Sequence, residues 1–172
     1  MAAPVMENGL AVSNPFDQSA WSRLRSRMFH LYFLFRRPMT LGVRGLVHDA
    51  ATNSIFLIRH TYVPGWQLPG GGVEVGETFV ESLARELEEE GNIVLSVSPA
   101  LKSIHLNKQA SRRDHVAFYL VQGFSQLRPK EPDHEIAEAG FFPLDALPEG
   151  TTPATRRRIA EVFDGAEASP YW

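Results

Sequence analysis

The length, composition and charge of the chain describe a globular protein and exclude several classes of function. The chain has 172 residues, of which 44% are hydrophobic and 22% charged, enough for one domain with a sizeable core. A net charge of -3 argues against broad, charge-driven nucleic-acid binding. The absence of cysteine excludes disulfides, thiolate metal sites and cysteine nucleophiles.

The N-terminal segment, residues 1–38, is predicted to be an arm that is partly disordered. Its second half, Trp21 to Arg37, is basic and aromatic, with apolar side chains near helical spacing. We expect a helix or an extended segment that packs on the domain or on a second copy of the chain, as a homodimer. Binding to a membrane surface is an alternative, but a membrane partner is not expected. No apolar run spans a bilayer and no signal peptide is evident, so a cytoplasmic protein is predicted.

Residues 39–168 are predicted to form the folded domain. Leu41–His48 and Ser54–His60 are β-rich runs separated by the turn residues Asp49–Asn53, which predicts a hairpin. A loop rich in glycine and proline follows, and Thr78 with Glu81 forms a capping box that opens a helix ending near Glu90. Further strands are predicted at Ile93–Val97, Ala100–Asn107, His115–Gln122 and Glu138–Phe142, before a helix that opens at Thr152 and Pro153 and ends near Gly165. This order predicts an α/β (α+β) fold with helices packed on a mixed β-sheet.

The most informative feature is a run of glutamates at the end of the first predicted helix: Glu86, Glu88, Glu89 and Glu90. Negative charges at a helix C-terminus oppose the helix dipole and repel one another. At about 100° per residue, Glu86, Glu89 and Glu90 share one arc of the helix, while Glu88 points elsewhere. Three carboxylates on one edge suit Mg²⁺ or Mn²⁺. A solvated acidic face is the alternative explanation.

The spacing around this run resembles the signature of the Nudix hydrolase family. Gly71 is followed after five residues by Glu77 and, after seven more, by Arg85-Glu86-Leu87-Glu88-Glu89-Glu90. The resemblance implies an α/β/α sandwich, with Glu86, Glu89 and Glu90 as ligands of Mg²⁺ or Mn²⁺. It also implies an ion pair between Glu77 and Arg85 that braces the loop. One position departs from the family pattern, since Asn92 replaces a usual glycine, and we expect the helix to end there nonetheless.

Residues for catalysis and substrate binding follow from the same resemblance. Glu89 or Glu90 is a candidate general base, and Glu135, on a later loop, is our first choice. Tyr62 and Trp66 are placed to stack a base, although core packing is the alternative for Trp66. Gly71 lets the backbone approach a ligand, and guanidinium groups suit phosphate oxygens, so the candidate phosphate contacts are Arg44, Arg59 and Arg113.

The predicted function is metal-dependent hydrolysis of the pyrophosphate bond of a nucleoside diphosphate derivative, by attack of water on phosphorus. The derivative is a nucleoside diphosphate linked to another moiety, or a nucleoside triphosphate. The alternative is a Nudix domain that senses a nucleotide without turnover. Markers of known substrate subgroups are not evident after the motif, so the sequence does not select a substrate.

Overall fold

The computed structural model describes residues 24–29, 31–32 and 38–172. The chain divides into two units, residues 1–38 and 39–172, and each is considered by itself. In the first unit, residues 24–29 and 31–32 are helical, which is one of the two conformations expected for the arm. The remaining predictions for the arm fall outside the described residues, and contact with a second copy stays a prediction.

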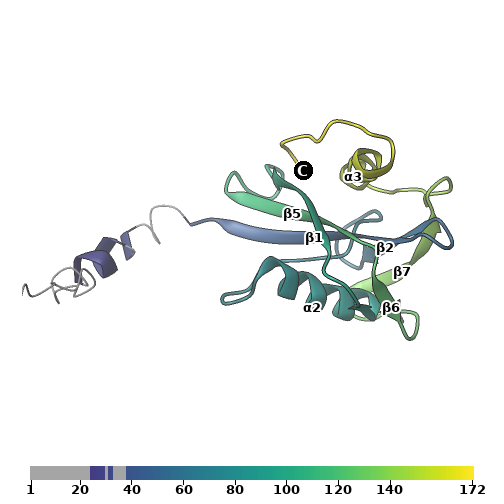
Figure 1. Ribbon diagram of the computed structural model, residues 1–172, viewed down its shortest axis with the longest axis horizontal. Coiled ribbons are helices and arrows are strands. Elements are labelled where there is room, and N and C mark those ends of the chain that lie inside the picture. Colours follow the sequence, from purple (N-terminus) through teal and green to yellow (C-terminus); the bar gives the residue numbers. More distant parts are fainter. Residues whose placement is uncertain (1–23, 30, 33–37) are drawn as a thin grey trace, which may run out of the picture. The chain divides into compact units, whose positions relative to one another are not determined.

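A five-stranded sheet forms the centre of the second unit (Figure 1). Its order is β4 (Ala100–Leu106), β5 (Asp114–Val121), β1 (Thr40–Asp49), β2 (Ser54–His60) and β7 (Ile136–Pro143). β1 and β5 are parallel, and the other neighbours are antiparallel. β3 (Ile93–Leu95) and β6 (Phe124–Gln126) make a separate antiparallel pair. The predicted hairpin and the mixed sheet are therefore confirmed.

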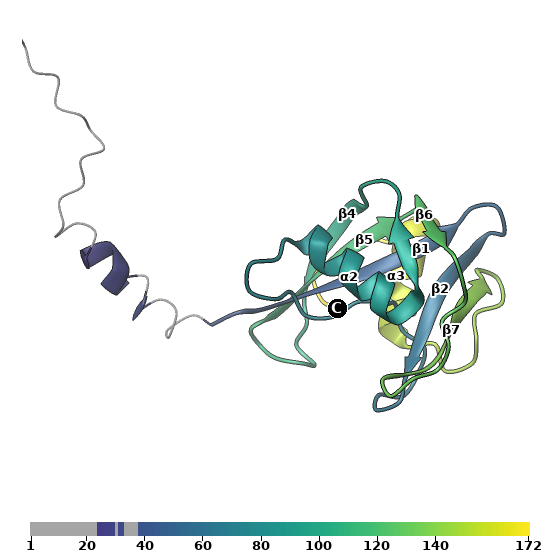
Figure 2. The ribbon, with the colours of Figure 1, turned by 90° about the horizontal axis from the view of Figure 1, so that it is seen from below.

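Two helices cover opposite faces of this sheet, which completes an α/β/α sandwich and confirms the predicted fold class (Figures 1 and 2). α2 (Phe79–Gly91) begins at the N-cap Thr78, where both hydrogen bonds of the capping box with Glu81 are present. α3 (Pro153–Phe163) begins at the N-cap Thr152, with proline in its first turn. Among the described residues, no helix is long and apolar enough to cross a membrane.

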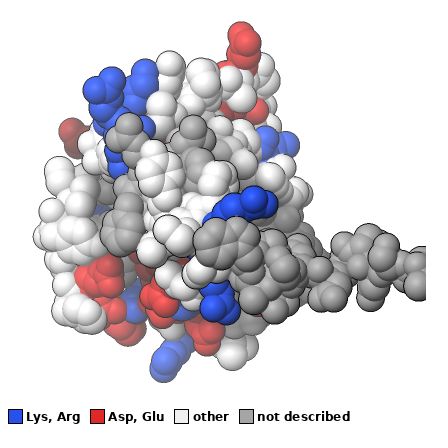
Figure 3. Space-filling model, turned by 90° about the vertical axis from the view of Figure 1, so that its left-hand side faces the viewer, with Lys and Arg blue, Asp and Glu red and all other residues white. Residues whose placement is uncertain are grey.

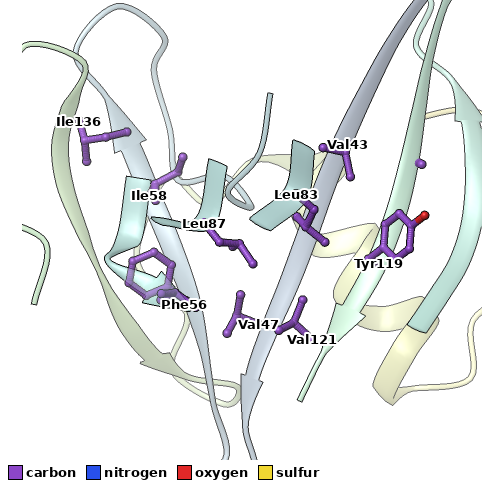
Figure 4. Packing of buried hydrophobic residues seen from close by; sticks show 11 residues of the cluster. Val43, Val47, Phe56, Ile58, Leu83, Leu87, Tyr119, Val121 and Ile136 are labelled. Carbon is purple, nitrogen blue, oxygen red and sulfur yellow. The ribbon is translucent and has the colours of Figure 1, made fainter. Parts of the chain in front are cut away.

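Alternation along the central strands produces two cores. One face of β1 and β2 contributes Val43, Val47, Phe56 and Ile58 to a cluster with Leu83 and Leu87 of α2 (Figure 4). The other face contributes Leu46, Ile55 and Leu57 to a cluster with Ile159 of α3. Each fully buried side chain of this size contributes about 1.5–3 kcal/mol. The first cluster therefore fixes α2, and the glutamates at its end, on the sheet.

The strand boundaries differ from the predictions in a few places. β3 ends at Leu95 rather than Val97, since the chain turns after it and Pro99 cannot donate to a ladder. β7 begins at Ile136, two residues earlier than predicted. β6 was not predicted at all, because three residues are too few to show an alternating pattern.

Candidate active site

The glycine-rich loop before α2 is held against β1 by backbone hydrogen bonds. The N–H groups of Val43 and Gly45 donate to the carbonyls of Gly71 and Pro69, each at 2.9 Å. Gly70 has a φ of 134°, and a Cβ there would lie 2.1 Å from the Val43 carbonyl oxygen. Only glycine fits this position, and the close approach turns the Gly70 N–H toward the end of α2.

Glu90 lies at the centre of the site and is 4% exposed. Its Oε2 accepts a hydrogen bond of 2.6 Å from the N–H of Gly70, and its Oε1 lies 3.6 Å from Nε2 of His60. Burial raises the pKa of Glu90 to about 8, although the charge of Arg44 and the Gly70 hydrogen bond act in the opposite direction.

Glu86, one turn before Glu90, lies against the same loop. A Cβ added at Gly71 would lie 2.3 Å from Oε1 of Glu86, so this glycine leaves room for the carboxylate. Burial raises the pKa of Glu86, while its contact with Arg85, at 2.9 Å, lowers it. The structure therefore brings Glu86 and Glu90 together on the face that meets the loop.

Glu89 lies at the edge of this face. Its side chain is 59% exposed, and Oε2 accepts a hydrogen bond of 3.2 Å from Nη1 of Arg85. Glu88 is exposed as well, but it falls on another side of the helix. The three glutamates of the predicted arc thus differ in burial, with only Glu89 open to solvent.

Arg85 and Glu77 join the helix to the loop. Nε of Arg85 donates to Oε1 of Glu77 at 2.9 Å, and Nη2 donates to Oε2 at 3.2 Å. Nη2 also donates to the carbonyl of Gly72 at 3.2 Å. The hydrogen bond from Arg85 lowers the pKa of Glu77 to about 2, with a further contribution from the N–H of Glu74. These contacts place Glu77 and Arg85 where they brace the loop.

A second group of ligand atoms surrounds Glu90. Ligand atoms of His60, Glu90 and Glu135 all lie within 4.8 Å of one another, and the hydroxyl of Tyr62 donates to Oε1 of Glu135 at 3.0 Å. Burial lowers the pKa of His60, and the charge of Arg44 adds to this. Sequence reasoning named Glu135 and Tyr62 but missed His60. Its signal was its alternation with Phe56 and Ile58, whose side chains face α2.

The three candidate arginines lie in different surroundings. Arg44 donates to the carbonyl of Leu68 at 3.1 Å and lines a pocket of about 300 Å³ beside the first turn of α3. Arg59 pairs with Glu138. Arg113 belongs to the turn before β5, where its carbonyl accepts from the N–H of Thr40 at 3.2 Å. Arg44 is the one of these three whose charge acts on Glu90.

Trp66 packs into the second core. Its ring meets Phe142 edge to face at 4.7 Å, and Arg59 lies 5.8 Å above it. Tyr62 is 64% exposed and lies over His60, with 5.0 Å between the ring centroids. Of the two aromatic residues, Tyr62 presents its ring to solvent. Trp66 instead packs in the core, which was the alternative to stacking on a base.

Asn92 ends α2 without glycine at that position. It adopts the left-handed conformation, with φ 52° and ψ 33°, and its N–H bonds back to the carbonyls of Leu87 and Glu88. Its Nδ2 donates to the carbonyl of Pro129 at 3.1 Å. The departure from the family motif is therefore accommodated, and the helix terminates as expected.

A glycine loop fixed against a sheet, with buried carboxylates at the end of the helix that follows, defines a class of hydrolases that act on nucleotide derivatives. Known proteins of this class match the chain. The NUDIX domain matches residues 38–163, so the chain belongs to the NUDIX family and is a Nudix pyrophosphohydrolase, which acts on acid anhydrides in phosphorus-containing compounds.

Several named proteins and solved structures are similar to this chain. The chain is 38% identical over 102 residues to a putative mutator protein MutT4 of Mycobacterium tuberculosis, a match that covers 58% of this chain and 41% of that protein. It is 30% identical over 131 residues to an ADP-ribose pyrophosphatase of Methanocaldococcus jannaschii, covering 73% of each. Among solved structures, a MutT NUDIX hydrolase from Burkholderia pseudomallei superposes with a TM-score of 0.61 at 30% identity, over 72% of this chain and 97% of that one.

Proposed function

We propose that the chain uses a divalent cation, Mg²⁺ or Mn²⁺, to cleave the pyrophosphate bond of a nucleoside diphosphate derivative by attack of water on phosphorus. One observation carries the proposal: the buried carboxylate of Glu90 accepts a hydrogen bond from the Gly70 N–H, and Glu86, one turn earlier in α2, packs against Gly71 of the same loop. No lysine or arginine side chain contacts Glu90 within the described residues. The carboxylate of Glu90, a hard oxygen donor without such a partner, fits a divalent cation.

Glu86 and Glu90 would hold this cation, because they are the two glutamates that face the loop. When bound, the cation would neutralise pyrophosphate charge and make a coordinated water more acidic. Arg44 lines the 300 Å³ pocket beside α3, and its positive charge acts on Glu86 and Glu90. We assign that pocket to the nucleoside part of the substrate, with Arg44 as a phosphate contact.

Glu89 is the general base in this proposal. Its carboxylate is exposed, one oxygen is oriented by Arg85, and the other can accept the proton of the attacking water. Glu77 and Arg85 act through the loop, since they hold Gly72 and the first turns of α2 in place. Glu135, the first choice for the general base from the sequence, is the alternative base, since its carboxylate lies near Glu90 and accepts a hydrogen bond from Tyr62.

The surface fits a small-molecule substrate better than a nucleic acid. On the face drawn in Figure 3, acidic and basic side chains are interleaved rather than gathered into one basic patch. With a net charge of -3, this distribution supports the expectation of no strong nucleic-acid binding.

A substrate panel with metal tests the proposal. The purified chain, with Mg²⁺ or Mn²⁺, should release phosphate-containing products from at least one nucleoside triphosphate or nucleoside diphosphate conjugate. Glu89→Gln and Glu90→Gln should each lower turnover by at least about 100-fold, the scale of a lost general base or ligand. Glu88→Gln, on the same helix but off the site, is the matched control and should retain turnover.

Full turnover in both variants would refute the assignment of these glutamates. Tight nucleotide binding by the wild type without turnover of any compound in the panel would instead favour the alternative function, a Nudix domain that senses a nucleotide.

A further inference from the structure

The chain after α3 returns to the sheet, where residues 169–172 pair with the end of β4 (Figure 1). The N–H of Leu106 donates to the carbonyl of Pro170 at 2.9 Å, and the N–H of Trp172 donates to the carbonyl of Leu106 at 3.2 Å. Nη2 of Arg157, in α3, donates to the carbonyl of Trp172 at 3.0 Å. Trp172 is therefore fixed between the last residue of β4 and the helix α3.

A buried histidine and a buried arginine hold residues 169–172 from the core side. The side chains of His105 and Arg158 are both 0% exposed. Nδ1 of His105 lies 2.7 Å from the carbonyl oxygen of Ser169, which can only accept, so the imidazole donates there. Nη1 of Arg158 lies 2.7 Å from the other ring nitrogen, Nε2. One residue of β4 and one of α3 thus meet beneath residues 169–172.

The ring of Trp172 packs on this pair and also reaches a pocket. Its centroid lies 5.6 Å from that of His105 and 6.2 Å from that of Phe118, both edge to face. The guanidinium carbon of Arg158 lies 5.3 Å from the same centroid. Trp172 is nevertheless only half-buried, and it lines the 300 Å³ pocket beside α3 together with Arg44. Trp172 therefore belongs to the wall of the pocket as well as to the core.

The pocket combines three kinds of polar and aromatic group. The residues that supply an aromatic ring, amides and guanidinium groups are Trp172, Gln67, Gln109, Arg44 and Arg157. Aromatic rings stack on nucleobases, and amides donate and accept hydrogen bonds as the edges of bases do. Guanidinium groups suit phosphate oxygens. An apolar tail in this pocket would leave the amides without hydrogen-bond partners, so the lining fits a nucleotide better.

We propose that Trp172 is a specificity-determining residue that stacks on the base of the substrate, and that His105 is a positioning residue that holds Trp172 in the pocket wall. The inference rests on the proposed function, which assigns this pocket to the nucleoside. It deepens that function by naming the substrate class, phosphate derivatives that carry an aromatic base. A contact that is equally strong before and during the reaction changes KM and leaves kcat unchanged.

Tryptophan fluorescence of the full chain tests the contact without turnover. The chain has three tryptophans, so Trp21→Phe combined with Trp66→Phe leaves Trp172 as the only one. In EDTA, a panel of nucleoside triphosphates and ADP-ribose should include at least one compound that changes Trp172 emission saturably. Tripolyphosphate, which carries no base, should leave the emission unchanged. Emission that responds to no nucleotide, or equally to tripolyphosphate, overturns the inference.

Steady-state kinetics with the best nucleotide substrate separate binding from chemistry. Trp172→Ala should raise KM by at least about 5-fold, the scale of one lost base–aromatic stack, and change kcat by less than about 2-fold. Trp172→Phe keeps an aromatic ring and should restore most of the affinity. His105→Gln should raise KM by at least about 2-fold, the lower end for one aromatic contact. His48→Gln is the matched control, because this buried histidine meets Phe163 at the other end of α3, and it should retain its KM.

An unchanged KM in Trp172→Ala contradicts the role of Trp172, and the fluorescence result decides the question if this variant does not fold. A lower kcat with unchanged KM in His105→Gln would show a general structural role and remove His105 from the proposal. Turnover by the wild type without any response of Trp172 would leave the proposed function standing while this inference fails. A response of Trp172 to nucleotides without turnover would give the reverse result.

Discussion

The helices α2 and α3 begin alike, but the buried charge in α3 has an oppositely charged side-chain partner and the buried carboxylate in α2 does not. Each opens on a threonine N-cap and covers one face of the sheet. In α3, the fully buried Arg158 pairs at 2.5 Å with Glu161, one turn later, and the same oxygen accepts from the N–H of Ser169 at 3.1 Å. In α2, the buried Glu90 bonds to a backbone N–H and lies near a histidine.

We infer from this difference that the buried charge in α3 stabilises the fold, whereas the buried charge in α2 binds a ligand. When a buried charge is paired with an opposite charge, removing either partner strongly destabilises the fold. A buried carboxylate without such a partner has a raised pKa, a property that is common at functional sites. Pairing, rather than burial alone, distinguishes the two helices.

The largest expected effect lies in α3. Arg158→Met should lower the free energy of unfolding by about 3–5 kcal/mol, because it leaves Glu161 buried and unpaired. Urea denaturation followed by fluorescence measures the loss.

Arg158→Met combined with Glu161→Leu is the control, because replacing both partners by apolar groups is often neutral or stabilising. If the double variant is no more stable than the single variant, the assignment of a structural role to this ion pair is wrong.

A smaller effect is expected where the backbone approaches the carboxylates of α2. Gly71→Ala should displace the Glu86 carboxylate, since the added Cβ would lie 2.3 Å from Oε1, and should weaken Mg²⁺ binding by about 10-fold. Gly72→Ala meets nothing within 4 Å and should retain its metal affinity. Calorimetric titration of both variants gives the comparison. Equal affinities would show that Glu86 does not contribute to the metal site.

The smallest effect concerns the brace and its dependence on pH. The pKa of Glu77 in the folded chain is lowered from 4.5 to about 2, so its contribution to stability is present above pH 4.5 and is lost as the pH falls toward 2. In metal-free protein, Glu77→Gln should therefore lower the melting temperature near pH 6. The difference from wild type should shrink below pH 4.5. A difference that is constant from pH 6 to pH 3 would contradict the role of the Arg85 contact.

Local signals predicted much of the fold and the glutamate helix. Capping residues fixed the start of α2, and turn residues between two β-rich runs predicted the β1–β2 hairpin. The sequence did not predict short backbone pairings between segments distant in the chain, such as strand β6 and the bridge between Leu106 and Tyr171. In the site, the spacing of the motif named the glutamates, but it could not show that Glu90 is buried and Glu89 exposed. That distinction depends on how far β2 and the glycine loop reach across the end of the helix.

The hydrogen bonds around Glu90 also bear on how the chain acquires its affinity for a cation. Gly70 and Glu90 are 20 positions apart, and Tyr62 and Glu135 are 73 apart. Contacts of such sequence separation form late, because loop closure must precede them. A nascent or partly folded chain would thus present only scattered carboxylates to metal ions. Cation binding would then favour the finished structure over its precursors, and would not trap intermediates on the way to it.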